Sequence, residues 1–390
     1  MFADDPFRDV IDQPSLARGG SDQPLVNLIT ATPFAWREPG TIPARQWLYG
    51  SALLRGSLSL IVAPGAAGKT ALTAGMALAL ATGRDVLAKP VYRGPKRVWL
   101  WNLEDSRDEL DRLIMAAASH WQVKPADVAG RLFADSGLDG DGLIMASDGR
   151  TGFALNTGTI TALTAELLHR EIDVLIIDPF VSSHRVSEND NGAIDAVAKA
   201  WAKVAVEANC AVLLVHHSRK LSGTENNAES ARGASALVNA ARSVLAINRM
   251  TRDEAERFGI EAGEAGRYFR VYDDKNNRAP PAERSDWYHL HSVSLCNGPD
   301  GMNGDSMPVV VPWTPPSDFS GVNVNHLCQV QDRIRDRNWR KDSQSGDWAG
   351  YAVIDVLGLD PDRKTDKARA GRLLKDWIKN GALIVENRLD

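Results

Sequence analysis

The segment from Leu58 to Thr70, LSLIVAPGAAGKT, constrains the fold more than any other part of the chain. It joins an apolar run, a glycine-containing loop and the start of a helical pattern in immediate succession. This is the local structure that a phosphate-binding loop requires. Gly65 and Gly68 let the backbone N–H groups face a phosphate. Lys69 is placed to meet the β and γ phosphates, and Thr70 offers a hydroxyl to Mg²⁺.

The loop departs from the usual motif at one position. That motif begins with glycine, and Ala63 stands there in this chain. Because the first glycine mostly permits a tight turn, alanine weakens the match only slightly. We therefore predict an ATP site whose contacts are Pro64, Gly65, Ala66, Ala67, Gly68, Lys69 and Thr70.

A second apolar run, Asp173 to Asp178 (DVLIID), ends in a carboxylate. A strand that ends in this way delivers an aspartate to the rim of a parallel sheet, where nucleotide-bound Mg²⁺ is held. We therefore predict that Asp178 and Thr70 are the protein ligands of Mg²⁺.

The general base is expected on a neighbouring strand. Pro179 follows Asp178, so the glutamate that follows the metal aspartate in many P-loop enzymes is missing. Glu104, at the end of RVWLWNLED, is placed to orient the attacking water. A base at this position is typical of RecA-type ATPases. Asp105 is the alternative, and an acidic pair here could also serve only to satisfy a helix dipole.

Apolar runs alternate with helical patterns from residue 57 onward. The runs are SLSLIVA, RVWLWNL, DVLIID, AVLLVHH, SVLAINR and RYFRVYD, and helices are expected from Lys69 to about Ala81 and from Ser106. This alternation predicts an α/β fold with a mostly parallel sheet covered by helices on both faces. We expect an extended lead-in over 1–50, a RecA-type P-loop core over 51–300, a linker over 301–325 and a separate unit over 326–390.

Charge and composition argue against several classes of protein. A net charge of −5 disfavours a chain that coats nucleic acid by overall charge. Cys210, Cys296 and Cys328 form no CxxC pair, so neither a disulfide framework nor a zinc site is indicated. No apolar run approaches the roughly 20 residues that cross a bilayer, and the acidic start lacks the pattern of a signal peptide. We therefore expect a cytoplasmic protein without a membrane partner.

Five segments together resemble the hexameric plasmid replicative helicase RepA and related phage ATPases. They are PGAAGKT, LED at Leu103–Asp105, DVLIID, HHSRK from His216 and RGASALVNAAR from Arg232 to Arg242. The resemblance spans roughly residues 45–280. It implies a RecA-type fold, a homo-oligomeric ring or filament with ATP between subunits, and Glu104 as the base. It also implies that the histidine pair senses the γ-phosphate and that Arg242 reaches into a neighbour's site.

The histidines and a later cationic segment have more specific expected roles. His216 and His217 end a strand beside the metal strand, and we favour His217 as the sensor. The alternative is a pair that merely satisfies loop backbone. The segment YDDKNNRAPP resembles a stretch of the RecA recombinase whose cations contact ATP across the subunit interface. That resemblance makes Lys275 and Arg278 ligands of a neighbour's ATP.

Two polar loops, 181–192 and 218–231, follow the ends of the proposed catalytic strands. Long loops in this position are usually functional or disordered. In the family they would line a channel for single-stranded DNA, and a merely solvated loop is the alternative. The cations available in them are Arg185, Arg219 and Lys220.

The last segment holds three helical patterns, at 327–337, 348–357 and 365–379, followed by the apolar run ALIVE. Thr365 is expected to cap the third helix. Helix, helix, helix and strand together are typical of a winged-helix domain. Seven Lys and Arg face two Asp between Arg363 and Lys379. We predict that Lys367, Arg372 and Lys375 contact the DNA backbone; a docking site for a protein is the alternative.

These patterns favour an ATP-driven DNA motor, a RepA-like ring helicase of phage or plasmid type. A RecA-type recombinase or mediator is an alternative, and so is a DNA-bound regulator that uses slow ATP turnover as a switch. The polar loops lack clustered aromatic residues for base stacking, which disfavours the recombinase.

Overall fold

The computed structural model describes residues 30–140, 142–150, 152–218, 227, 235–280, 283–299 and 304–386. The chain divides into two units, Met1–Ala44 and Arg45–Asp390. In the described part of the first unit, the one regular element is a short 3₁₀ turn, η1 (Pro39–Thr41). Phe34 and Trp36 of this unit are exposed.

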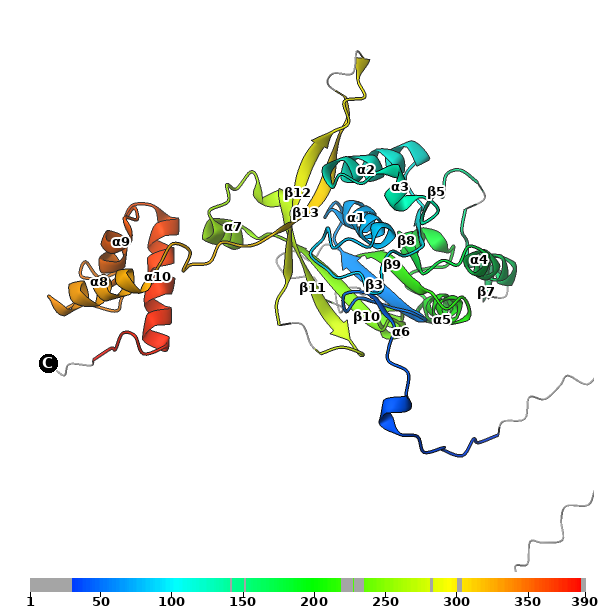
Figure 1. Ribbon diagram of the computed structural model, residues 1–390, viewed down its shortest axis with the longest axis horizontal. Coiled ribbons are helices and arrows are strands. Elements are labelled where there is room, and N and C mark those ends of the chain that lie inside the picture. The colour runs from blue at the N-terminus through cyan, green and yellow to red at the C-terminus, as the bar shows by residue number, and fades with distance from the viewer. Residues whose placement is uncertain are drawn as a thin grey trace, which may run out of the picture. The chain divides into compact units, whose positions relative to one another are not determined.

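The second unit is built on a nine-stranded sheet with the order β13-β12-β11-β10-β3-β9-β8-β4-β5 (Figure 1). From β10 to β5 every neighbouring pair of strands is parallel, whereas β11, β12 and β13 pair antiparallel. The predicted α/β fold with a mostly parallel sheet is therefore confirmed. The strands are β3 (Ser57–Ala63), β4 (Val98–Asn102), β5 (Leu132–Ser136), β8 (Val174–Asp178), β9 (Ala211–His217), β10 (Ser243–Arg249), β11 (Tyr268–Asn276), β12 (Asp286–Ser294) and β13 (Ser306–Trp313).

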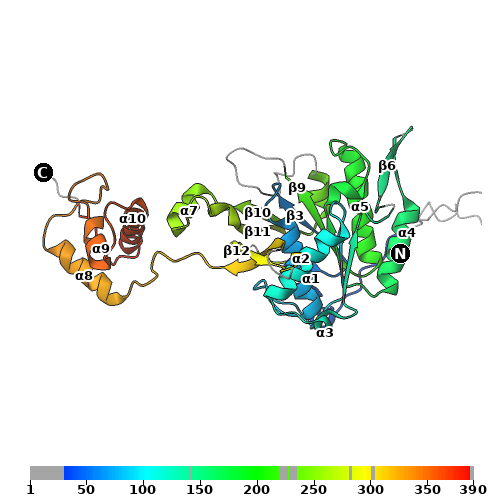
Figure 2. The same cartoon turned by 90° about the horizontal axis from the view of Figure 1, so that it is seen from above.

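Helices cover both faces of this sheet (Figures 1 and 2). One apolar layer joins the sheet to α1 (Lys69–Thr82) and α2 (Arg107–His120), and the other joins it to α4 (Thr157–His169), α5 (Asn191–Glu207) and α6 (Ser235–Ala240). Because β8 is buried on both faces, its sequence is a continuous apolar run. The remaining elements of the core are α3 (Pro125–Val128), η2 (Phe180–Ser183), α7 (Arg252–Phe258), η4 (Ala265–Arg267) and the strand pairs β1–β2 (Trp47–Tyr49, Leu53–Leu54) and β6–β7 (Ala146–Gly149, Gly152–Leu155).

The start of the linker predicted over 301–325 is wrong, because β13 lies inside it. Every residue of β13 pairs with β12, from Ser306 opposite Ser294 to Trp313 opposite Trp287. The hairpin they form runs alongside α2 (Figure 1), where Arg112 forms an ion pair with Asp305 at 2.9 Å. The ATPase core therefore extends to Trp313.

The C-terminal segment forms three helices where the sequence predicted them: α8 (Val324–Arg335), α9 (Gly350–Leu357) and α10 (Lys364–Lys379). They enclose an apolar cluster of their own, which includes Val330, Trp348, Leu373 and Trp377. Two expectations fail. Arg363, not Thr365, occupies the N-cap of α10, and the expected strand ALIVE is absent from the described residues 380–386. The wing of a winged helix is therefore missing from the part of the chain that the structure describes.

Among the helices of the described ranges, none combines the length and the apolar character that crossing a membrane would require.

Candidate active site

The phosphate loop connects the end of β3 to the start of α1. Ala66 and Gly68 have left-handed backbone conformations, with φ of 54° and 82°. At Gly68 a Cβ atom would also lie 3.1 Å from the Leu290 side chain, so both the backbone conformation and the close side chain favour glycine there. Gly65 has open space around it. Of the two loop glycines, Gly68 is left-handed and Gly65 is not.

Lys69 is the buried cation of the loop. Its ammonium donates to the Pro64 carbonyl oxygen at 3.1 Å and contacts His217 Nδ1 at 3.1 Å. An ammonium has only donors, so Nδ1 accepts and the neutral ring of His217 carries its proton on Nε2. Burial lowers the pKa of Lys69, opposed by the charges of Asp178 and Glu104. Burial and the charge of Lys69 lower the pKa of His217 in turn, which favours this neutral acceptor.

The two histidines face different surroundings. His216 is buried between Phe180 and Glu188, with its Nδ1 3.8 Å from Glu188 Oε1. Burial is the main cause that lowers the pKa of His216 to about 4, and the nearby His217, His184 and Lys69 act in the same direction. Only His217 lines the nucleotide cavity. The geometry therefore favours His217 over His216 for contact with the phosphate site.

Asp178 and Thr70 meet at the predicted metal position. The Thr70 side chain hydrogen-bonds to the Asp178 carboxylate. Oδ2 of the Asp178 carboxylate is buried and has no hydrogen-bond partner among the described residues. Burial raises the pKa of Asp178 to about 6, although the Thr70 hydrogen bond and Lys69 oppose the shift. An orphaned carboxylate oxygen beside a hydroxyl fits Mg²⁺, which prefers hard oxygen ligands.

Glu104 and Asp105 are held differently, although both line the cavity. Asn102 Nδ2 donates to the Asp105 carboxylate at 2.8 Å, and Asn102 Oδ1 accepts from the backbone N–H groups of both acidic residues. The Glu104 carboxylate instead accepts from the Ser182 hydroxyl at 3.1 Å. Asn102 thereby holds Asp105 at the strand end, while the second carboxylate oxygen of Glu104 has no partner among the described residues and is available for water. Sequence reasoning missed Asn102 and Ser182, because neither belongs to a recognisable motif.

The cavity bounded by these residues has a volume of about 350 Å³, and its lining combines polar and apolar groups. Loop residues, Lys69, Glu104 and Asp178 are the polar part of the lining. Leu110 and Leu113 of α2, with Met307 and Pro308 of β13, are the apolar part. This combination matches a nucleotide, whose phosphates are charged and whose base is flat and largely apolar.

The contact between Ser182 and Glu104 leads to a first prediction. Ser182→Ala should lower kcat by about tenfold, because a hydrogen bond that orients the charged base is lost. KM for ATP should stay unchanged, since Ser182 lies outside the cavity lining. Steady-state ATPase kinetics would measure both values, with Ser187→Ala, an exposed serine of the same segment, as the matched control. An unchanged kcat in Ser182→Ala would show that this hydrogen bond does not position the base.

Three of the predicted nucleotide ligands lie at the opposite end of the strands from the phosphate loop. β10 is parallel to β3, with Ser243 opposite Ser59, so Arg242 is adjacent to the strand ends that lie away from the phosphate loop. The Lys275 ammonium donates to the carbonyl oxygens of Val238 and Ala241, at 2.7 and 3.2 Å, and so caps α6. Arg242 and Arg278 are exposed. None of the three can reach the phosphate loop of its own chain.

The residues predicted to contact DNA differ in their exposure and in their partners within the chain. Arg185 is exposed, and its backbone bonds to Ala146 beside β6 at 2.8 Å. Arg219 and Lys220 lie outside the described residues. In the C-terminal unit, Arg372 pairs with Asp318 at 2.9 Å, and the Lys367 ammonium lies 3.3 Å from the Tyr351 hydroxyl. Lys375 is exposed.

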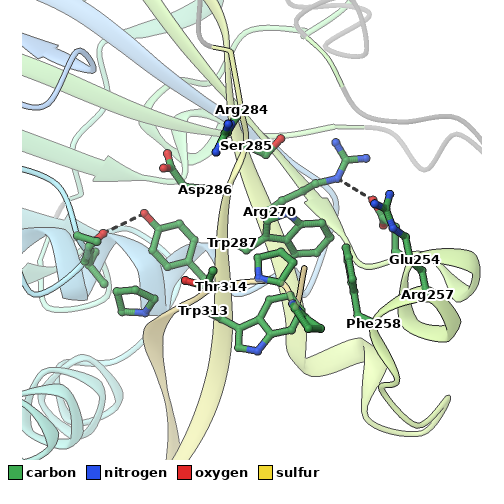
Figure 3. Close-up of a pocket in the computed structure, with 16 residues that line it drawn as sticks. Glu254, Arg257, Phe258, Arg270, Arg284, Ser285, Asp286, Trp287, Trp313 and Thr314 are labelled. Atoms are coloured by element: carbon green, nitrogen blue, oxygen red, sulfur yellow. Dashed lines mark hydrogen bonds and ion pairs between the residues drawn. The ribbon is translucent and has the colours of Figure 1, made fainter. Parts of the chain in front are cut away.

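A second cavity, of about 850 Å³, lies near the start of β12 and the end of β13 (Figure 3). Phe258, Trp287 and Trp313 contact one another edge to face, with ring centroids 5.5 to 5.7 Å apart. Arg270 pairs with Glu254 beside them at 3.3 Å (Figure 3). The aromatic rings and charged groups thus satisfy one another. Nothing in this cavity resembles the catalytic set around Lys69.

Comparison with known families agrees with this site. Residues 23–223 match a family model described as an AAA domain, slightly more than half of the chain. The chain belongs to this AAA-domain family. It is thus a P-loop ATPase by family, and the match includes Lys69, Glu104, Asp178 and His217. The match ends before β10, so it does not reach Arg242 or Lys275.

Proposed function

We propose that this AAA-family ATPase is a DNA motor of the RepA-like ring type, active as a homo-oligomer. The hydrogen bond between Lys69 and His217 carries the proposal. Lys69 is the residue that meets the phosphates, and His217 is the last residue of β9, directly before the polar segment at 218–231. When ATP draws Lys69 toward its phosphates, His217 loses its partner. Nucleotide state is thereby communicated to the segment expected to contact single-stranded DNA.

The chemistry proposed at the site is ATP hydrolysis by water. Lys69 binds the β and γ phosphates, while Asp178 and Thr70 hold the metal. Mg²⁺, when bound, neutralises charge on the phosphate oxygens. Glu104, oriented by Ser182, holds the attacking water in line and accepts its proton.

The proposed oligomer follows from the position of the cations. Arg242 and Arg278 are exposed at the ends of the strands that lie away from their own phosphate loop. An arginine supplied by a neighbour stabilises the charge that develops during phosphoryl transfer. In a ring, this end of the strands of one subunit would face the nucleotide of the next subunit. Lys275 would have to leave the α6 carbonyl groups to take part, so we assign the role to the two arginines.

For DNA contact by α10, we now favour exposed lysines over Lys367 and Arg372. Arg372 is paired with Asp318, which precedes α8, and the ammonium of Lys367 lies over the Trp348 and Tyr351 rings. Lys364, Lys375 and Lys379 are exposed, and their spacing of 11 and 4 residues places them on one face of the helix. We propose that this face meets the phosphate backbone, which positions a protein without specifying sequence.

Two measurements test the proposed function. ATPase activity of the intact protein should rise when single-stranded DNA is added. Replacing Lys364, Lys375 and Lys379 with alanine should weaken DNA binding similarly on unrelated sequences. Each lost phosphate contact should lower the slope of log K against log salt by about 0.7 on single strands or about 0.9 on duplex.

The control removes the same charge elsewhere, by alanine at the exposed lysines Lys124, Lys199 and Lys203. An ATPase indifferent to DNA would overturn the motor, and if it still bound DNA it would be a DNA-bound regulator. An unchanged salt slope in the α10 variant would exclude α10 as the DNA-binding face.

A further inference from the structure

Arg249 contacts the phosphate loop, although no motif includes it. It is the last residue of β10, and β10 lies beside β3, the strand that leads into the loop. One guanidinium nitrogen, Nη2, donates to the Gly65 carbonyl oxygen at 3.1 Å and also to the Ala66 carbonyl oxygen. The Arg249 side chain is otherwise exposed. The contact therefore comes from the same chain and needs no neighbouring subunit.

Three consecutive carbonyl oxygens of the loop accept hydrogen bonds from cationic side chains. Pro64 O accepts from Lys69, and the next two carbonyl oxygens accept from Arg249. Ala66 is left-handed, and a left-handed residue within a turn gathers successive N–H groups into an anion-binding concavity. Cations that hold the carbonyl oxygens favour the peptide orientations of this concavity. A left-handed conformation is less favourable for alanine than for glycine, so the hydrogen bond from Arg249 to the Ala66 carbonyl oxygen helps to stabilise it.

We propose that Arg249 is a positioning residue for the nucleotide: its guanidinium holds the Gly65 and Ala66 carbonyl groups and so keeps the loop N–H groups aimed at the β-phosphate. The proposal rests on the nucleotide site of the AAA domain and not on the DNA motor. Arginine suits this task because its planar group is pre-organised and cannot be deprotonated in proteins. The charge of Arg249 also contributes to lowering the pKa of the nearby Lys69.

The test is nucleotide affinity of the full chain, measured by calorimetric titration of ADP and of a non-hydrolysable ATP analogue. Arg249→Ala should weaken both ligands equally, by about tenfold, because both carry the β-phosphate that the loop holds. KM for ATP should rise by a similar factor, while kcat at saturating ATP should remain within about twofold of the intact protein. Arg249→Lys should recover part of the affinity, since an ammonium retains the charge but lacks the planar group.

Arg252→Ala is the matched control, because Arg252 is an exposed arginine three residues further along. It should leave ADP affinity unchanged. Unchanged ADP affinity in Arg249→Ala would overturn the proposal. So would loss of affinity for the ATP analogue alone, which would mean a γ-phosphate contact, or a fall in kcat with unchanged KM, which would mean a role in the transfer step.

Mixing separates this role from the proposed inter-subunit role of Arg242. Arg249 acts on the loop of its own chain, so adding Lys69→Ala subunits should leave the raised KM for ATP of the Arg249→Ala subunits unchanged. A KM that returned to the value of the intact protein in that mixture would overturn the same-chain assignment. Because ADP affinity requires neither DNA nor hydrolysis, the result stands apart from that of the proposed motor.

Discussion

Glu104→Gln is expected to bind ATP with normal affinity and to lose turnover by about 10²- to 10⁴-fold, the usual contribution of a positioned general base. The amide retains the size of the carboxylate and can still accept from Ser182, but it cannot take a proton from water. Binding should survive because Lys69, Thr70 and the loop are unchanged. Single-turnover hydrolysis and equilibrium titration with ATP would separate the chemical step from binding.

The matched control is Asp105→Asn, which changes the neighbouring carboxylate in the same way. Asp105 is held by Asn102, so we expect only a modest loss of activity in this variant. Lys69→Ala should lose both binding and hydrolysis, because Lys69 contacts the phosphates directly. Normal hydrolysis by Glu104→Gln would show that the base is misassigned and would make Asp105 the next residue to test.

Arg242→Ala is expected to reduce kcat by about 10³-fold or more, the scale on which an arginine from a neighbour acts in phosphoryl transfer. The motivation is its exposed position at the ends of the strands that lie away from its own phosphate loop. If the arginine acts between subunits, the specific activity of the intact protein should rise with concentration. Mixing Arg242→Ala with Lys69→Ala subunits should restore activity, since some interfaces then pair an intact loop with an intact arginine.

Arg170→Ala provides the control, because Arg170 is a half-exposed arginine whose i,i+4 ion pair with Glu166 lies on the surface of the core. Its activity should match that of the intact protein. Arg278→Ala should resemble Arg242→Ala, though less severely if one cation dominates. A monomer that is fully active at every concentration would contradict the proposal for both residues.

The parts of the candidate site that could be predicted from the sequence are those whose signals are local. PGAAGKT lies between a buried strand and a helix, and Asp178 and Glu104 each end or directly follow an apolar strand, so their position at one sheet edge follows from parallel strand order. The existence of α1 and of the three C-terminal helices was predictable for the same reason, with limits correct to within three residues. Helical periodicity and stop signals are written in neighbouring residues.

Contacts between distant segments could not be predicted from the sequence, because they depend on how the strands pair. Arg249 reaches Gly65, and Ser182 reaches Glu104, only because strand pairing brings residues 184 and 78 positions apart together. β13 was assigned to a linker because its Gly- and Pro-rich surroundings conceal a strand whose partner is β12. The sequence predicts Arg372 as a DNA contact, whereas in the structure Arg372 forms an ion pair with Asp318. Local patterns record which conformation a segment prefers, whereas the partner of an exposed charge or an edge strand depends on which other segments the fold brings near it.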